Sequence, residues 1–151
     1  SLKKENPNWN ITLSDKSEES LNTALENSKI ILGEELIHFH SDLFNSFPPE
    51  ISFDIIVSNP PYIPIEEKDS LMKDVIDFEP HEALFLEDPS NFFNLFLIQA
   101  KQRLKPGGKI YLEVHSEWAK KIQEISKDLL FNSCTIKKDY SEKDRMLRIE
   151  L

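Results

Sequence analysis

The sequence predicts an α/β protein with a mostly parallel sheet and an antiparallel hairpin of strands at its C-terminal end. Strand-like and helix-like patterns alternate along most of the chain, which is typical of an α/β layer. The run Phe53 to Val57 (FDIIV) is apolar and rich in β-branched residues, as expected of a strand buried on both faces of a parallel sheet. Two strand-like runs around a charged turn close the chain and predict the antiparallel hairpin.

Periodicity and chain breakers place the individual elements. The predicted strands are residues 11–13, 36–40, 53–57, 109–114, 133–138 and 146–151. Apolar residues three and four positions apart predict one helix after Asp15 and two more over residues 91–104 and 118–129. The first helix is expected to begin at an acidic or hydroxyl cap and to weaken at Asn27 and Ser28. Residues 63–88 predict a long irregular excursion with one short helical turn near 71–76.

Composition bounds the class of protein. The 151 residues, 39% hydrophobic and 30% charged, suit a single domain with one sizeable core. The longest apolar stretches fall short of the roughly 18–20 residues that cross a bilayer, so no membrane association is expected. Cys134 is the single cysteine and nothing resembles a signal segment, so a reducing cytoplasm is the expected location.

Several kinds of active site lack their motifs here. The three glycines, at positions 33, 107 and 108, form neither a GxGxxG motif nor a P-loop. One cysteine and four scattered histidines do not have zinc-site spacing, so no metal is predicted. The sequence contains no GxSxG motif that would position a nucleophilic serine, so hydrolysis by a catalytic triad is not predicted.

The tetrapeptide Asn59-Pro60-Pro61-Tyr62 is the candidate site. It directly follows the FDIIV strand, and open α/β sheets bind ligands at the carboxyl ends of their strands. The prolines stiffen the loop and donate no backbone N–H, Asn59 adds a side-chain oxygen, and Tyr62 adds a flat ring. Two acceptors and a ring suit a planar –NH₂ group, whose lone pair then turns toward an electrophile. The alternative is a strand terminator with Tyr62 in the core; the preceding strand and following excursion favour binding.

This arrangement resembles the Rossmann-like class I methyltransferases that use S-adenosylmethionine, in which a strand ending in Asn-Pro-Pro-Tyr holds the acceptor nitrogen. Within that group the chain most resembles the release-factor glutamine-N5 methyltransferases. The matching segments are residues 11–15, 40–44, 59–62, 78–80, 83–84, 106–108, 113, 139–140 and 144–145. The Phe-Glu-Pro at 78–80 and the Ala-Leu at 83–84 are the more family-specific part, because adenine-N6 enzymes share NPPY.

The resemblance implies S-adenosyl-L-methionine as cofactor and methylation of a glutamine side-chain amide in a peptide chain release factor. It implies that Asp15 accepts hydrogen bonds from the cofactor ribose and that Asp42 and Leu43 border the adenine. The alternative for Asp15 is a simple helix cap. Methyl transfer would be a direct displacement, in which positioning is the main contribution. The residues implied to bind the substrate amide are Asn59, Pro60, Pro61 and Tyr62, with Asn59, Pro60 and Tyr62 catalytic and Asn59 also beside the cofactor.

The chain departs from the family pattern in two places. The family has a Gly-rich loop after a first, central strand, and neither is found here, so residues 1–151 are expected to be the C-terminal portion of one catalytic domain. Sheet edges would then lie open, and the chain alone is expected to bind the cofactor weakly or not at all. The second departure is Val114 to Trp118, which stands where the family usually has a glycine and a glutamine.

Three functions remain to be weighed. Glutamine methylation of a release factor and adenine-N6 methylation of DNA or RNA share the NPPY chemistry. Residues 66–88 hold nine acidic residues against two lysines and so carry −7 of the net charge of −9. That charge repels nucleic acid and favours a basic protein partner, so no direct nucleic-acid binding is expected. The third possibility is a non-catalytic remnant.

Overall fold

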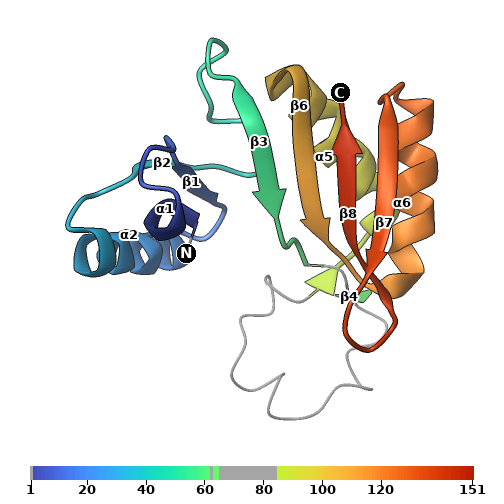
Figure 1. Cartoon of the computed structure of the whole chain (residues 1–151), viewed down its shortest axis with the longest axis horizontal. Coiled ribbons are helices and arrows are strands. Elements are labelled where there is room, and N and C mark those ends of the chain that lie inside the picture. The colour runs from blue at the N-terminus through green and yellow to red at the C-terminus, as the bar shows by residue number, and fades with distance from the viewer. Residues whose placement is uncertain (1, 62, 65–84) are drawn as a thin grey trace. The chain divides into compact units, whose positions relative to one another are not determined.

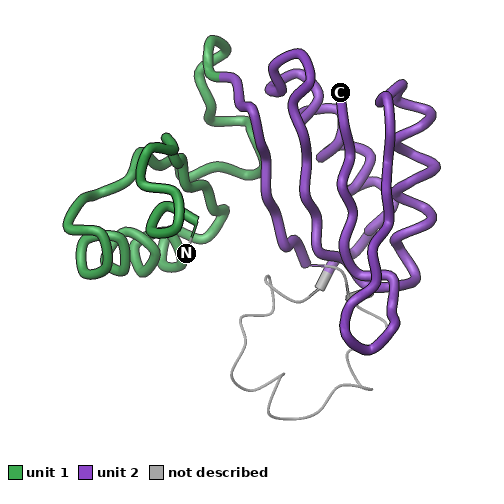
Figure 2. The backbone as a smooth tube through the Cα atoms, in the orientation of Figure 1, with its two compact units in different colours: residues 1–51 green, residues 52–151 purple. Residues whose placement is uncertain are grey.

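The computed structural model describes residues 2–61, 63–64 and 85–151. They divide into two compact units, Ser1–Ile51 and Ser52–Leu151 (Figure 2). The predicted α/β class is confirmed, with parallel strand pairs in both units and antiparallel strands at the C-terminal end. The helical turn predicted near 71–76 lies outside the described residues. No helix in the described ranges is long and apolar enough to cross a membrane.

Unit 1 contains a small parallel sheet and its connecting helix. Its elements are α1 (Leu2–Glu5), β1 (Thr12–Asp15), α2 (Glu18–Leu32) and β2 (Ile37–His40). Strands β1 and β2 pair in parallel, with Asp15 opposite His40. Leu21 and Leu25 are the buried apolar residues of α2. They are four positions apart, a spacing that places both side chains on one face of the helix.

Helix α2 has the predicted hydroxyl cap but a different end. The Ser17 hydroxyl accepts a hydrogen bond from the Ser20 N–H at 3.2 Å, which satisfies one donor of the first turn. The predicted weakening at Ser28 is wrong, because the helix continues to Leu32. The buried Ser28 hydroxyl lies 2.8 Å from the Leu25 carbonyl oxygen and 3.0 Å from that of Glu34, so it is satisfied within the helix and its loop. Gly33, with φ 73°, ends the helix in the left-handed conformation.

Unit 2 is built on a four-stranded sheet. Its elements are β3 (Phe53–Ser58), β4 (Ile63–Pro64), β5 (Phe85–Leu86), α5 (Pro89–Arg103), β6 (Leu104–Glu113), α6 (Ser116–Asp128), β7 (Ser133–Lys138) and β8 (Asp144–Glu150). The strand order is β3-β6-β8-β7, in which β3 and β6 are parallel and the other two neighbouring pairs are antiparallel. Strands β4 and β5 form a short parallel pair at the described ends of the predicted excursion, which the sequence did not indicate.

The core of unit 2 lies between its sheet and two helices. Helices α5 and α6 cover one face of the sheet (Figure 1). The fully buried apolar residues of this layer are Phe93, Leu97, Ala100, Ile110, Val114, Ala119, Ile122 and Ile149. Successive side chains of a strand point to opposite faces of the sheet. Tyr111 in β6 and Met146 in β8 point to the face away from these helices and are 38% and 43% exposed.

Strand β3 differs from its prediction. The prediction that it is buried on both faces is wrong for unit 2: Ile55 and Val57 are 38% and 58% exposed, whereas Ile56 is buried against the helix side. Among the described strands β3 pairs with β6 alone, so it forms an edge of the sheet. Ile55 and Val57 face the side of the sheet on which the described residues of unit 2 place no helix, and Asp54 is exposed as well.

Strand β6 begins at Leu104, earlier than predicted, but its pairing with β3 is irregular between Leu104 and Lys109, where Gly107 has φ 75°. A Cβ atom on Gly108 would lie 3.2 Å from the Phe53 carbonyl oxygen and 2.9 Å from the Leu104 side chain. The same Cβ atom would lie 2.9 Å from the Lys105 carbonyl oxygen, so the irregular start of β6 itself, more than its approach to β3, favours glycine here.

Candidate functional site

The candidate tetrapeptide starts directly after β3, which ends at Ser58. The Asn59 side chain is exposed, Pro60 is buried and Pro61 is half-buried. A buried proline beside an exposed amide fixes the backbone while leaving the amide accessible to a ligand. The predicted role requires an accessible Asn59, and the residue is exposed; the role itself stays a prediction. Tyr62 lies outside the described residues.

The ends of β3 and β6 meet at one edge of the sheet (Figure 1). Ser58 pairs with Leu112, so Asn59 and Glu113 each directly follow a paired residue at this end of the sheet, and Glu113 is the last residue of β6 and exposed. Helix α6 begins three residues later, and the N–H groups of its first turn carry partial positive charge at this end. Glu113 is one of the positions that match the family, and its place at the end of β6, next to the last residue paired with β3, makes it a further candidate.

The segment from Val114 to Trp118, where the chain departs from the family pattern, packs into the core of unit 2. Val114 is fully buried, and its N–H donates to the Arg145 carbonyl oxygen at 2.9 Å. The Trp118 ring lies 5.8 Å from that of Phe93, and the Lys121 ammonium lies 4.2 Å from the Trp118 ring centroid. Trp118 therefore makes an aromatic contact in the core of unit 2.

In unit 1 the parallel register brings Asp15 and Asp42 to one strand edge. Asp15 is the last residue of β1, and its carbonyl oxygen accepts a hydrogen bond from the Ser41 N–H at 3.0 Å, just past the end of β2. Its Oδ1 accepts from the Ser17 N–H at 2.8 Å. The cap of α2 is Ser17, so the Asp15 carboxylate shapes the turn before the helix. This one bond leaves the carboxylate with further acceptor sites.

Lys16 and His40 stand beside these carboxylates. Lys16 Nζ lies 3.3 Å from Asp42 Oδ2, and both side chains are more than half exposed. His40 Nε2 lies 2.8 Å from the Lys16 carbonyl oxygen, which ties the turn after β1 to the end of β2. Sequence reasoning assigned no role to Lys16. Its position directly after Asp15 was the only available signal.

Leu43 has a left-handed backbone with φ 51°, which is uncommon for a residue with a Cβ atom. The turn is held by the Ser46 N–H, which donates to the Ser41 hydroxyl oxygen at 2.9 Å. The half-buried Leu43 side chain is thereby presented next to Asp42. Strained residues of this kind cluster at binding sites. Two carboxylates beside an apolar side chain have the chemistry to bind hydroxyl groups next to a flat apolar ring.

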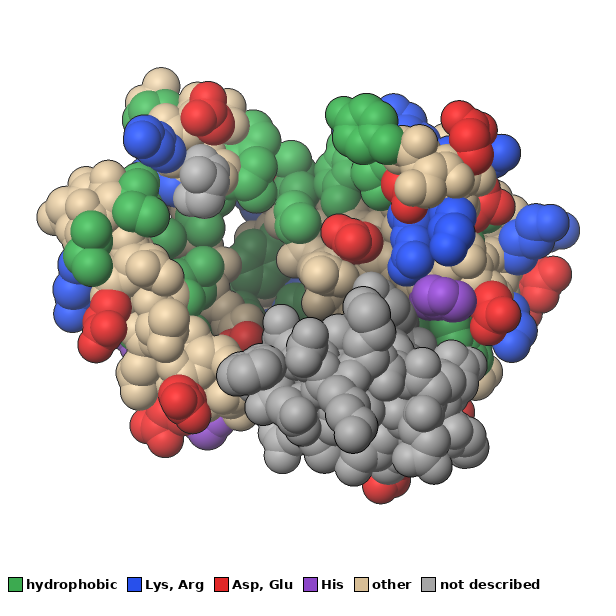
Figure 3. Space-filling model, turned by 90° about the horizontal axis from the view of Figure 1, so that it is seen from below, with side chains coloured by type: hydrophobic (Ala, Val, Ile, Leu, Met, Phe, Trp, Pro, Cys, Tyr) green, Lys and Arg blue, Asp and Glu red, His purple; other side chains and the backbone are tan. Residues whose placement is uncertain are grey.

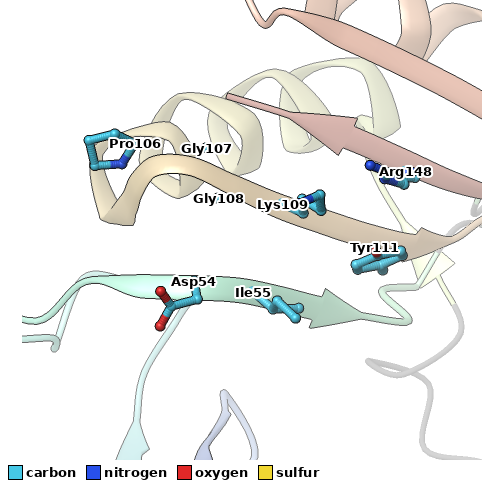
Figure 4. Close-up of a pocket in the computed structure, with 8 residues that line it drawn as sticks. All are labelled: Asp54, Ile55, Pro106, Gly107, Gly108, Lys109, Tyr111 and Arg148. Carbon is cyan, nitrogen blue, oxygen red and sulfur yellow. The ribbon is translucent and has the colours of Figure 1, made fainter.

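An open pocket of about 500 Å³ lies on the uncovered face of the sheet in unit 2 (Figure 4). Its lining residues are Asp54, Ile55, Pro106, Gly107, Gly108, Lys109, Tyr111 and Arg148. It lies toward the start of β3 and β6, at the other end of these strands from Asn59.

The cations around this pocket are paired with carboxylates. Arg148 donates to Glu150 at 2.8 Å and Lys105 to Asp54 at 2.8 Å. The hydrogen bond from Lys105 holds the pKa of the Asp54 carboxyl below its ordinary value. The hydrogen bond from Arg148 does the same to the pKa of Glu150. Because these charges are internally neutralised, the pocket is a weak candidate for binding an anion.

Curated relatives support the resemblance found in the sequence. A family model described as Eco57I restriction-modification methylase matches residues 1–145. A release factor glutamine methyltransferase of Leptospira interrogans is 48% identical over 149 residues, which cover 97% of this chain and 52% of the relative. A relative of the same name from Flavobacterium psychrophilum is 35% identical, covering 99% of this chain and 53% of its own length. The chain thus spans about half the length of these relatives.

Solved structures agree on the fold. A methyltransferase from Pyrococcus furiosus has a TM-score of 0.68 at 20% identity, covering 99% of this chain and 66% of its own. An N-methyltransferase from Bradyrhizobium japonicum, in complex with S-adenosyl-L-homocysteine, has a TM-score of 0.55 at 15% identity. The match covers 92% of this chain and 65% of that structure's chain. The Rossmann-like methyltransferase fold expected from the sequence is thereby confirmed.

Proposed function

Because the chain belongs to the family described as Eco57I restriction-modification methylase, we propose that it takes part in methyl transfer from S-adenosyl-L-methionine to the side-chain amide of a glutamine. The proposed acceptor is a glutamine of a peptide chain release factor, as in the names of the curated relatives. Both units are proposed to belong to one catalytic domain. Translation takes place in the cytoplasm, which is therefore the proposed location.

The observation that carries this proposal is the exposed Asn59 side chain fixed between β3 and the buried Pro60. In the proposed reaction the Asn59 side-chain oxygen and the Pro60 carbonyl oxygen each accept one N–H of the substrate carboxamide. Pro61 stiffens this loop, and Tyr62 packs on the amide plane. With both protons held, the nitrogen lone pair points away from the loop, and positioning supplies most of the acceleration.

The residues proposed to bind the cofactor lie in unit 1, apart from Asn59. The Asp15 carboxylate would accept hydrogen bonds from the ribose hydroxyls, while Asp42 and Leu43 would border the adenine. S-adenosyl-L-methionine, when bound, supplies an electrophilic methyl group on a sulfonium. The substrate nitrogen would form a bond to the methyl carbon as the carbon–sulfur bond breaks, leaving the neutral thioether S-adenosyl-L-homocysteine, and one N–H proton would pass to solvent, so that the product is a neutral secondary amide.

A second candidate is adenine-N6 methylation, which the restriction-modification description of the family model favours. An adenine amino group is also planar, so Asn59 and Pro60 would bind it in the same way. The acidic residues between 66 and 88 disfavour it, because they repel a phosphate backbone. The proposed partner is accordingly a protein, without direct binding of nucleic acid or membrane.

The experiment that separates these functions follows the methyl group. The protein that carries this chain is incubated with labelled S-adenosyl-L-methionine and either a release factor or an adenine-containing DNA duplex. Tandem mass spectrometry of the factor is expected to locate one added methyl group on a glutamine. Label in the DNA alone would support adenine methylation, and label in neither acceptor would support a non-catalytic remnant.

A further inference from the structure

The turn between β7 and β8, residues 139–143, lies at the same end of the sheet as Asn59, with β7 and β3 as the two outermost strands. Strand β8 is antiparallel to both β6 and β7, so β7 runs in the direction of β6 and β3 (Figure 1). Its end at Lys138 therefore emerges where β3 ends at Ser58. The base of the hairpin is fixed to this end of the sheet, because the Val114 N–H donates to the Arg145 carbonyl oxygen at 2.9 Å.

The turn is braced by the carboxylate of Asp139. Its Oδ1 accepts hydrogen bonds from the Ser141 N–H at 2.7 Å and the Lys143 N–H at 3.0 Å. Arg145 Nε lies 3.7 Å from Oδ2 of the same carboxylate. The Lys143 N–H, more than any other group, holds the pKa of the Asp139 carboxyl below its ordinary value. One carboxylate thus ties together backbone groups from the middle and the end of the turn and the Arg145 side chain.

Tyr140 stands at the tip of this braced turn with its side chain fully exposed, at 110% of the reference area. An aromatic ring on a rigid element offers a large contact area and loses little conformational entropy on binding. The charges around it balance: Lys138, Lys143 and Arg145 oppose Asp139, Glu142 and Asp144. Side chains of both signs gather on unit 2 in the view toward this end of the sheet (Figure 3). A balanced turn with an exposed ring favours a protein surface over a phosphate backbone.

We propose that Tyr140 is a specificity-determining contact for the protein substrate, whose apolar surface next to the acceptor glutamine packs against the ring. This inference rests on the proposed function, because it takes the methyl acceptor to be part of a folded protein. Tyr140 acts on binding of the substrate protein and not on the reacting atoms. Its removal is therefore expected to change KM and to leave kcat nearly unchanged.

The kinetic test compares Tyr140→Ala, Tyr140→Phe and the unaltered protein, with a release factor and with a short peptide containing the acceptor glutamine. For the factor, Tyr140→Ala is expected to raise KM about tenfold, within the range for loss of an aromatic interface contact, with kcat within about twofold. Tyr140→Phe is expected to retain the original KM, and the peptide to show no difference between variants. Leu130→Ala is the matched control: it also removes an exposed apolar side chain, but at the end of α6. An unchanged KM for the factor with Tyr140→Ala would overturn the proposal.

A measurement of substrate binding without catalysis tests the Tyr140 contact independently of the proposed function. The dissociation constant of the factor, measured by isothermal titration calorimetry, is expected to rise about tenfold with Tyr140→Ala. The same rise without any methyl transfer would support the contact and count against the proposed function. Equal binding by both proteins, or none by the unaltered protein, would overturn the contact. A loss of affinity confined to single-stranded DNA or RNA would also overturn it, in favour of stacking on a nucleobase.

Discussion

Leu130 adopts a left-handed backbone conformation, which is unfavourable for a residue with a Cβ atom. It has φ 58° and is 79% exposed, one residue past Leu129, the C-cap of α6. Its N–H donates to the Lys127 carbonyl oxygen at 2.9 Å, and the Phe131 N–H donates to that of Ser126 at 3.0 Å. These two bonds define a helix ending in which glycine is the favoured residue.

Leu130→Gly is therefore expected to stabilise unit 2. A left-handed backbone costs a residue with a Cβ atom about 1–2 kcal/mol, and the extra freedom of glycine in the unfolded chain offsets part of the gain. The free energy of unfolding, measured by urea denaturation, is expected to rise by about 0.5–1 kcal/mol. Leu130→Ala keeps the Cβ atom and is the matched control. An equal gain with alanine would show that exposure of leucine, and not backbone strain, was responsible.

At the scale of elements, Lys101 joins α5 to the end of α6. Its Nζ donates to the Leu129 carbonyl oxygen at 2.5 Å and to that of Leu130 at 3.1 Å. The ammonium also lies 5.3 Å from the Phe131 ring centroid. Terminal carbonyl groups of a helix have no partner within the helix, and this lysine supplies one from the neighbouring element.

Lys101→Met should weaken the packing of these two helices. Methionine keeps the apolar stem but cannot donate, so the free energy of unfolding is expected to fall by roughly 1–2 kcal/mol. Lys120→Met, on the exposed side of α6, is the matched control and is expected to change it by less than about 0.5 kcal/mol. The two variants are compared by thermal and urea denaturation. Equal stability of both variants would mean that the contacts of Lys101 contribute nothing.

At the scale of the whole molecule, the two units differ in how well their sheets are buried. Strands β1 and β2 form a two-stranded sheet in which no residue is buried. Strand β6 is paired on both sides, and Ile110 lies in a layer with Leu147 and Ile149, which are 0–1% exposed. Two-stranded sheets are marginally stable in water, whereas central strands over a core are the last to open.

Hydrogen exchange should therefore separate the units. Followed by NMR, amide groups hydrogen-bonded between β1 and β2 are expected to exchange on the order of 100-fold faster than those between β6 and β8, because they open locally without loss of the core. Amides at the helix core of α6 serve as an internal reference for global unfolding. Equal protection in both sheets would contradict independent local opening of unit 1.

Local features of this molecule were predictable, and pairing across the sheet was not. Helix α6 and the β7–β8 hairpin follow from apolar periodicity and a charged turn. The exposure of Asn59 follows from the two prolines that stop β3. The edge position of β3 and the β4–β5 pair depend on which distant strands meet, and no local pattern encodes that. The left-handed backbone conformation of Leu43 could not be predicted from the sequence either, because leucine does not favour it.

The central claim is that Asn59 holds the acceptor amide, and the single-turnover rate of methyl transfer to the release factor tests it most directly. Asn59→Ala is expected to lower this rate by on the order of 10²–10³, as loss of one positioning acceptor implies. Asn94→Ala, which removes an exposed amide from α5, serves as the control and should retain the full rate. Thermal unfolding of both variants should match that of the unaltered protein. A folded Asn59→Ala protein that methylates the glutamine at the original rate would contradict the account.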